Sequence, residues 1–391
     1  MIAFDAYNAP RIIYGEGVSK NVSALLKSLG VKTVMAVYDE GIKKVGIADS
    51  VLAPIREAGF VVEEFGGVTA DPPVEMIEEA AKIADEKNVD IYIAIGGGGV
   101  IDTTKCMAVM HTNPGKLLDY VLGVGKPIPN ACPHVIAVPT TSGTGSEVTA
   151  LSIVTDTETH RKVCIKDVVK MCPYAAYLDP ALTTGLPKGL TASTGMDALS
   201  HAVEAYLVGR HNEYADMFCE NGIRRVIKWL PVAVEDGKNV EARGQMMLAA
   251  TFGGASFASS TLQAGHAVAH ALGGALHVPH GIACAWGLNF AITHCGQTCE
   301  LDRLHNLASF MGVADEAAMD REALVAACCK VVSDMNAKLN IPTPKSYGVG
   351  TEEEMEAAFN ACWTNEQGML GVAGVKDKEE VHDYFKEMWA W

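Results

Sequence analysis

The chain of 391 residues is 49% hydrophobic and 20% charged, and its formal net charge is −16. An acidic chain has no surplus of Lys and Arg to replace the counterions of a nucleic acid, so we expect no nucleic-acid partner. No stretch reaches the ~18 uninterrupted apolar residues of a membrane-spanning helix, and MIAFDAYNAP lacks the features of a signal peptide. The 11 cysteines, an odd number without a C-x-x-C pair, favour free thiols in a reducing compartment. We therefore expect a cytoplasmic protein without a membrane partner.

The first half alternates amphipathic helical segments with short apolar strands. Ser19 is the predicted N-cap of the first helix, and Gly30 its stop signal. The strands are continuous apolar runs, which is typical of strands covered on both faces and predicts a mostly parallel α/β sheet. Helices are predicted over 19–30, 49–59, 74–88 and 100–112, strands over 33–39, 61–65 and 90–99, and a further strand with its loop over 134–147.

After residue 178 the pattern changes to helical periods almost throughout. A Pro/Gly/Thr-rich connector is predicted over 179–195. The helical segments that follow are 196–207, 213–230, 242–259, 300–313, 321–339 and 378–391. We therefore predict an α/β domain over 1–185 and an all-α domain over 186–391.

Features of a nucleotide site lie in the first half. The strand IYIAIG runs into four glycines, Gly96 to Gly99, and a helix follows. Such a turn lets backbone N–H groups approach a diphosphate at a helix N-terminus, although it also suits a tight turn with close packing. A second loop, PTTSGTGSE, offers several hydroxyls. Asp39 ends another strand and could accept the ribose hydroxyls, or it could be an exposed turn residue. Because Asp39 precedes the glycine turn, the topology must differ from the standard Rossmann unit.

Histidines gather in AGHAVAHALGGALHVPHG, residues 264–281. His266 and His270 lie at i and i+4 and share a helix face, and His280 is expected in a loop after a proline. Upstream, Asp197 and His201 show the same spacing. One carboxylate with imidazoles suits Fe²⁺, Zn²⁺ or Mn²⁺, whereas each pair alone is also typical of buried core histidines.

Five motifs occur together and in order: GGGGVID, PTTSGTGSEVT, GMDALSHAVEAY, GHAVAHALGG and VPHG. Over nearly the whole chain they resemble the iron-containing (group III) alcohol dehydrogenases. The resemblance implies an N-terminal dinucleotide-binding domain, a C-terminal helical metal domain and a cleft between them. It also implies a homodimer.

Site residues carry over by motif position. The resemblance implies that the metal ligands are Asp197, His201, His266 and His280, and that His270 is a non-ligand active-site histidine. The implied cofactor-binding positions are Asp39, Gly97, Gly98, Gly99, Asp102, Thr140, Thr141, Thr144 and Lys162. Gly99 departs from the family, which usually has Ser there. His277 is left over and could lie beside the ligands or near the cleft.

The predicted function is NAD(H)-dependent interconversion of a short-chain aldehyde and its primary alcohol, with Fe²⁺, or Zn²⁺ or Mn²⁺, as the metal. Gln263 stands where the family has small or apolar residues, three positions before His266. With Asn365 and Gln367 it suggests a substrate with a polar or anionic group, such as lactaldehyde, sulfoacetaldehyde or succinate semialdehyde. Alternatively Gln263 hydrogen-bonds a neighbouring helix, and the enzyme is a broad aliphatic alcohol dehydrogenase. A metal-dependent lyase of the dehydroquinate synthase type and a non-catalytic binding protein are more remote alternatives.

Overall fold

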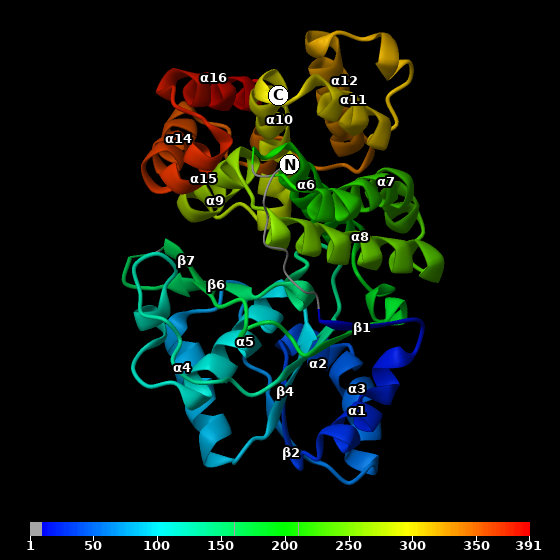
Figure 1. The fold of residues 1–391 in the computed structure, drawn as a ribbon, viewed down its shortest axis with the longest axis vertical. Helices are drawn as coiled ribbons and strands as arrows, with labels where there is room; N and C mark the ends of the chain where they lie inside the picture. Colours follow the sequence, from blue (N-terminus) through cyan, green and yellow to red (C-terminus); the bar gives the residue numbers. More distant parts are fainter. Residues whose placement is uncertain (1–9, 160, 210) are drawn as a thin grey trace. The chain divides into compact units, whose positions relative to one another are not determined.

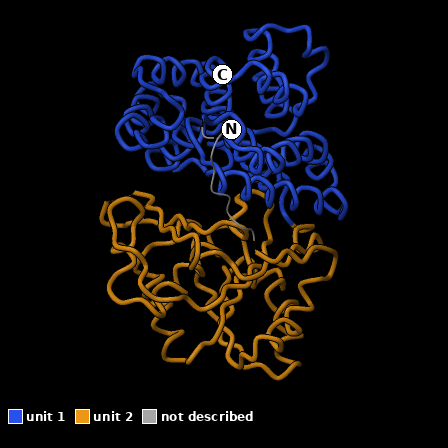
Figure 2. Tube along the Cα trace, in the orientation of Figure 1, with its two compact units in different colours: residues 1–6, 186–391 blue, residues 7–185 orange. Residues whose placement is uncertain are grey.

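A computed structural model describes residues 10–159, 161–209 and 211–391. Within these residues the chain forms two compact units, one that ends at Gly185 and one that contains Leu186–Trp391 (Figure 2). Each unit has its own secondary-structure class. We describe the two in turn.

The first unit is built on a six-stranded sheet in the order β1-β8-β5-β4-β2-β3. All of its strand pairs are parallel, which confirms the parallel sheet predicted from the apolar runs. The strands are β1 (Arg11–Tyr14), β2 (Thr33–Val37), β3 (Val61–Phe65), β4 (Ile91–Gly96), β5 (Val135–Pro139) and β8 (Ala175–Leu178).

Helices cover both faces of this sheet (Figure 1). Buried residues of α1 and α3 pack against one face, where alternate residues of β2, β4 and β5 form an apolar layer. On the other face α5 packs against β4 and β5, with α4 beside it. The bounds are η1 (Val18–Asn21), α1 (Val22–Leu29), α2 (Glu40–Lys44), α3 (Ile47–Glu57), α4 (Val74–Glu86), α5 (Gly98–Thr112) and η2 (Leu117–Tyr120).

The first helix begins later than predicted. Gly30 ends α1 in the left-handed conformation, with φ 70°, as expected for a stop signal. Ser19, however, is not the N-cap. It lies in η1, and its hydroxyl donates to Asp179 Oδ2 at 2.6 Å. The Ser19 hydroxyl, which local spacing assigned to the cap of the first helix, is therefore bonded to the buried carboxylate of Asp179 instead.

A two-stranded antiparallel hairpin, which the sequence patterns did not predict, follows the loop after β5. It consists of β6 (Leu151–Asp156) and β7 (Arg161–Lys166), and η3 (Ser146–Val148) precedes it. Lys105 of α5 is buried, and its Nζ donates to the carbonyl oxygens of Ser146 at 3.1 Å and Thr149 at 3.3 Å. Asp102 lies 3.2 Å from the same Nζ. These bonds hold the loop after β5 against the first half of α5, the helix that begins at the glycine turn.

The second unit is entirely helical in the part of the chain that the structure describes. Helix α6 begins at Lys188 and not at residue 196, so the predicted connector is two turns too long. Gly195, one of the glycines that suggested a connector, serves packing instead, because a Cβ there would lie 2.3 Å from the Leu230 side chain. Similarly, His280 is the first residue of a helix, not part of a loop.

Helix α6 packs against α7, α8 and α10 and is buried along most of its length (Figure 1). The bounds are η4 (Pro180–Thr183), which ends the first unit, α6 (Lys188–Leu207), α7 (Glu213–Glu235), α8 (Val240–Ser259), α9 (Ala264–Leu276), α10 (His280–Thr298), α11 (Leu301–Phe310), η5 (Glu316–Ala318), α12 (Arg321–Lys338), α13 (Pro344–Tyr347), α14 (Glu352–Asn365), α15 (Gln367–Ala373) and α16 (Lys378–Trp389).

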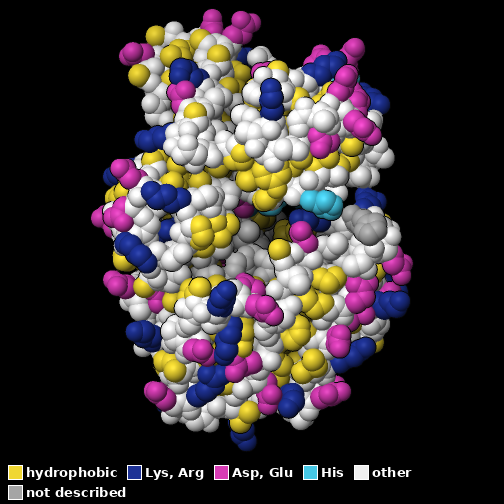
Figure 3. Space-filling view, turned by 180° about the vertical axis from the view of Figure 1, so that it is seen from behind, with side chains coloured by type: hydrophobic (Ala, Val, Ile, Leu, Met, Phe, Trp, Pro, Cys, Tyr) yellow, Lys and Arg dark blue, Asp and Glu magenta, His cyan; other side chains and the backbone are white. Residues whose placement is uncertain are grey.

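Acidic and basic side chains are interspersed over the face that Figure 3 displays. Among the described helices, none combines the length and the apolar character needed to cross a membrane.

Substitution Lys105→Met should lower the free energy of unfolding by about 3 kcal/mol, because it leaves Asp102 and the loop carbonyls without their buried cation. Lys82→Met, on the exposed side of α4, is the control and should change it by less than about 0.5 kcal/mol. Urea denaturation of both variants measures the difference. Equal midpoints for the two would mean that Lys105 does not hold the loop.

Candidate metal and nucleotide sites

One carboxylate and three imidazoles converge inside the helical unit. Asp197 and His201 come from α6, His266 from α9 and His280 from α10. Asp197 Oδ1 lies 3.5 Å from Nε2 of His201, 3.7 Å from Nε2 of His266 and 3.6 Å from Nε2 of His280. Asp197, His201 and His266 are buried, whereas the side chain of His280 is 33% exposed. Of the four side chains, that of His280 is therefore the one that solvent reaches most easily.

These separations fit ligands that share a metal ion. They exceed hydrogen-bond length, and Asp197 Oδ1 has no hydrogen-bond partner among the described residues although it is buried. Ligand atoms about 2.0–2.1 Å from one tetrahedral cation lie about 3.3–3.4 Å from one another. A buried, unpaired carboxylate oxygen that faces three imidazole nitrogens is thus suited to a divalent first-row metal.

The electrostatics keep the carboxylate ionised. Burial acts to raise the pKa of Asp197, but His201, His280 and His266 together outweigh it, so the pKa lies well below its usual range. Asp197 can therefore offer a negative oxygen to a cation at neutral pH.

A second buried carboxylate, Glu204, contacts Nδ1 of His266, the ring nitrogen that does not face Asp197. Its Oε1 lies 2.6 Å from His266 Nδ1, and its Oε2 accepts the backbone N–H groups of His266 at 3.2 Å and Gln263 at 3.0 Å. Burial raises the pKa of Glu204, and the contacts with His266 and Gln263 more than reverse this, so the net shift is downward. An ionised Glu204 holds the proton on Nδ1 and leaves the lone pair of Nε2 free for a metal.

Sequence reasoning missed Glu204, although a signal was present. Glu204 lies three residues after His201 and seven after Asp197, so all three share one face of α6. Gly265 makes room for it, since a Cβ there would lie 2.6 Å from Glu204 Oε1.

His270 lies next to this group, and His277 does not join it. The ring of His270 is centred 6.2 Å from that of His266 and 5.8 Å from that of His280. Its Nδ1 lies 3.6 Å from Oε2 of Glu366, which separates α14 from α15. His277 is exposed and ends α9 with φ 55°, a left-handed C-cap.

Gln263 is fully buried, and both ends of its amide are bonded within the helical unit. Nε2 donates to the carbonyl oxygen of Glu204 at 2.9 Å, and Oε1 accepts from Cys295 Sγ at 2.9 Å. This is the alternative in which Gln263 hydrogen-bonds a neighbouring helix. Asn365 and Gln367 are exposed, and Gln367 Nε2 donates to the carbonyl oxygen of Trp363.

In the first unit, the glycine turn and the threonine loop lie against each other. A Cβ on Gly97 would lie 3.2 Å from the Thr141 side chain, and one on Gly98 would lie 2.5 Å from the Thr144 methyl. Thr140 donates its N–H to the carbonyl of Gly96 at 3.0 Å. In the described chain no side chain caps the N-terminus of α5, and Val100 and Ile101 donate their N–H groups to the carbonyl of Gly97, so the N–H groups of Gly98 and Gly99 are the ones available to an anion.

Asp39 lies at the same edge of the sheet. It follows β2, which pairs in parallel with β4 and therefore ends beside the glycine turn. Asp39 Oδ1 accepts the N–H of Ile42 at 2.9 Å and caps α2. The other carboxylate oxygen is not used by this cap, so the residue could still accept a ribose hydroxyl.

Two of the other predicted cofactor residues, Asp102 and Lys162, are engaged by partners within the first unit. Both oxygens of Asp102 are engaged inside the unit, Oδ1 by Ser146 Oγ and Oδ2 by the N–H of Ile153. Lys162 of β7 pairs with Asp71 at 3.0 Å. A Cβ on Gly99 would approach the carbonyl of Ala70 to 3.3 Å, so Gly99 is near the segment that holds Asp71.

A family model described as iron-containing alcohol dehydrogenase matches residues 9–180, and one for the C-terminal part of that family matches residues 191–389. The chain is 35% identical over 356 residues to NADPH-dependent butanol dehydrogenase of Clostridium saccharobutylicum, covering 89% of this chain and 88% of the relative. A solved 1,3-propanediol oxidoreductase matches with a TM-score of 0.91 at 30% identity, covering 99% of this chain and 100% of its own. Sulfoacetaldehyde reductase from Bifidobacterium kashiwanohense, solved with NAD⁺, matches with a TM-score of 0.88 at 25% identity over 100% of both chains.

The fold and these matches define an enzyme of the alcohol dehydrogenase class. The chain belongs to the iron-containing alcohol dehydrogenase family, as its motifs predict.

Substitution Glu204→Gln should weaken metal binding by roughly 10–100-fold, because the amide cannot hold the His266 proton with a full negative charge. Competition with a chromophoric chelator measures the dissociation constant. Glu220→Gln is the matched control, a glutamate of α7 whose side chain is 43% exposed and pairs with Arg224, and it should bind as the native protein does. An unchanged constant in Glu204→Gln would show that this carboxylate does not orient the ligand.

Proposed function

We propose that the protein is a divalent-metal- and NAD(H)-dependent dehydrogenase that interconverts a short-chain aldehyde and its primary alcohol. The observation that carries the proposal is the convergence of three imidazole Nε2 atoms, at 3.5–3.7 Å, on the unpaired Oδ1 of Asp197. Fe²⁺ suits this donor set, as do Zn²⁺ and Mn²⁺.

Asp197, His201, His266 and His280 would hold the metal, and Glu204 would fix the tautomer of His266. A divalent cation there supplies Lewis-acid polarisation of the substrate oxygen, while the reduced nicotinamide supplies the hydride. The partly exposed side at His280 is where a small substrate could approach.

His270 is the proposed proton-transfer residue. It is half-buried beside the ligand group, and Glu366 lies 3.6 Å from its Nδ1. Reduction of an aldehyde requires a proton for the alcohol oxygen, and oxidation of the alcohol returns one to solvent. An imidazole backed by a carboxylate can hold that proton and pass it on.

For the nucleotide, Gly97 and Gly98 together with Thr141 and Thr144 form the proposed diphosphate cradle. Thr140, Gly99 and Lys162 flank it in our proposal, and Asp39 takes the ribose hydroxyls. Asp102 acts indirectly, by holding the segment around Ser146 against α5.

The proposed substrate is an unsubstituted short aliphatic aldehyde or alcohol. A polar pocket would need the amide of Gln263, which is occupied by Glu204 and Cys295. The named relatives act on substrates as different as butanol, 1,3-propanediol and sulfoacetaldehyde, so family membership leaves the substituent open. Family membership does favour a dehydrogenase over the lyase alternative.

Steady-state assays with NADH test the proposal on a panel of propionaldehyde, lactaldehyde, succinate semialdehyde and sulfoacetaldehyde. We expect kcat/KM for propionaldehyde to match or exceed the others. A clear preference for a charged aldehyde would contradict the aliphatic assignment, and absence of turnover with every metal-loaded form would contradict the activity itself.

Two substitutions separate metal binding from proton transfer. Asp197→Ala should abolish both metal retention and turnover, because the three imidazoles lose their shared anionic oxygen. His270→Ala should retain the metal and lose rate by roughly 10²–10⁴-fold. Metal analysis and kcat of each variant give the comparison, and full occupancy in Asp197→Ala would remove this residue from the ligand set.

Substitution of Asp39 tests the nucleotide preference. The native enzyme should prefer NADH to NADPH, because like charges about 4 Å apart repel by about 1–4 kcal/mol. Asp39→Gly should relax the preference by on the order of tenfold. Asp39→Asn keeps an acceptor for the α2 cap and removes only the charge, so it should behave similarly. Equal use of NADPH by the native enzyme would show that Asp39 does not face the 2′-position.

A further inference from the structure

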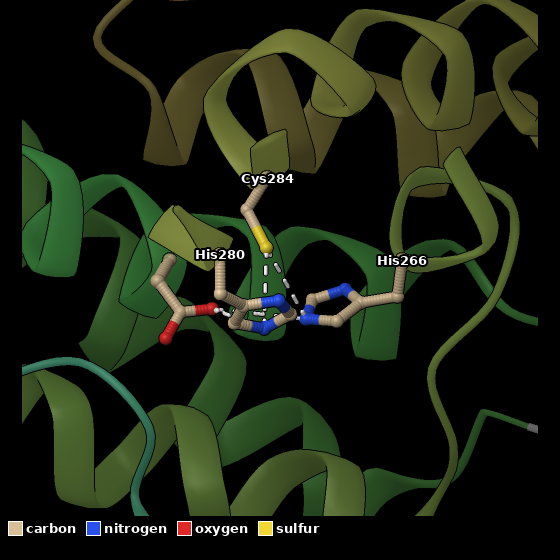
Figure 4. A group of neighbouring side chains, drawn as sticks. His266, His280 and Cys284 are labelled. Carbon is tan, nitrogen blue, oxygen red and sulfur yellow. Dashed lines mark hydrogen bonds and ion pairs between the residues drawn. The ribbon is translucent and has the colours of Figure 1, made fainter. Parts of the chain in front are cut away.

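A thiol belongs to the same group of side chains as the proposed metal ligands. Cys284 lies one turn after His280 on α10 and is buried. Its Sγ lies 3.5 Å from His280 Nε2 and 3.7 Å from His266 Nε2. Figure 4 shows the Cys284 side chain directed at both rings. Together with Asp197, one ligand atom from each of these residues lies within 4.8 Å of every other.

Both contacts lie within hydrogen-bond reach of the thiol, and their lengths also suit ligands that share a cation. A thiol has a single proton and can donate to only one of the two Nε2 atoms at a time. A sulfur about 2.3 Å and a nitrogen about 2.0–2.1 Å from one cation lie about 3.1–3.8 Å apart at the bond angles of a five-coordinate site. The unpaired Oδ1 of buried Asp197 faces the same point, which independently indicates a cation there.

We propose that Cys284 is a fifth ligand of the bound metal, joining Asp197, His201, His266 and His280 through its sulfur. On binding, the S–H bond breaks, the thiolate sulfur donates its electron pair to the cation, and the proton leaves to solvent; no oxidation is involved. The inference rests on the proposed metal site, because it adds a sulfur to ligands that the family motifs imply.

A thiolate changes which metal the site selects. Sulfur ligands favour Zn²⁺ and Co²⁺ over the harder Mn²⁺, whereas a site of carboxylate and imidazoles discriminates less. The Zn²⁺:Mn²⁺ affinity ratio should therefore fall by on the order of tenfold or more when the sulfur is replaced by oxygen.

Spectroscopy of the native protein tests the sulfur directly and requires no variant. After removal of metal with a chelator, the full chain is reloaded with Zn²⁺ or Co²⁺. We expect a scatterer near 2.3 Å in the X-ray absorption fine structure of the zinc form. We also expect a sulfur-to-cobalt charge-transfer band in the near ultraviolet of the cobalt form.

Cys284→Ser should lose the band and the sulfur scatterer while still binding one metal ion per chain. Cys328→Ser is the matched control, a buried cysteine of α12 outside the four-residue group, and should keep both signals. Competition titrations with Zn²⁺ and Mn²⁺ on both variants measure the affinity ratio, and circular dichroism checks that both are folded.

The outcomes distinguish the two proposals. A native protein that binds the metal through nitrogen and oxygen alone overturns the role of Cys284 and leaves the proposed function standing. A band that persists in Cys284→Ser also overturns it. A folded native protein that binds neither Zn²⁺ nor Co²⁺ overturns the metal site, and with it both proposals.

Discussion

The burial of two carboxylates on α6 is the constraint that the helical unit satisfies. An ionised carboxylate in an apolar interior is strongly unfavourable unless charges or hydrogen-bond donors surround it. Asp197 meets this requirement with imidazoles from three helices, and Glu204 with the ring and backbone of His266 and the N–H of Gln263. The start of α9 is thus fastened to α6 at the point where the candidate metal ligands meet.

Small residues permit this approach. A Cβ on Gly287 would lie 2.4 Å from the carbonyl of Gly265, so α9 and α10 can cross only where both residues are glycine-sized. A Cβ on Gly281 would lie equally close to the carbonyl of Ser193, which brings the start of α10 against α6. Gly265 and Gly281 of the histidine-rich segment therefore serve packing between helices, and the close packing brings His266 and His280 to Asp197.

The first unit follows a different constraint, which concerns backbone rather than charge. Its glycine turn leaves N–H groups uncovered, and Thr141 and Thr144 pack where larger side chains on the glycines would stand. Buried Lys105 then holds the following loop through carbonyl oxygens rather than through a surface ion pair. A loop held this way can present a fixed surface to a ligand, since its own backbone groups are already satisfied.

Residue patterns alone determined the parallel sheet, the helical second half, and the pairing of Asp197 with His201, because strand burial and i,i+4 spacing are local properties. They could not determine where Gln263 points. It precedes the first turn of α9, so helical spacing relative to His266 does not apply, and only the fold placed its amide against Glu204 and Cys295. Cys284 was missed because His280 was expected in a loop. Since α10 begins at His280, helical spacing does apply there and puts His280 and Cys284 on one face of the helix. The contacts of α6 with the start of α9 and with α10 join residues 59 to 84 positions apart, and such pairings arise from packing that no local pattern encodes.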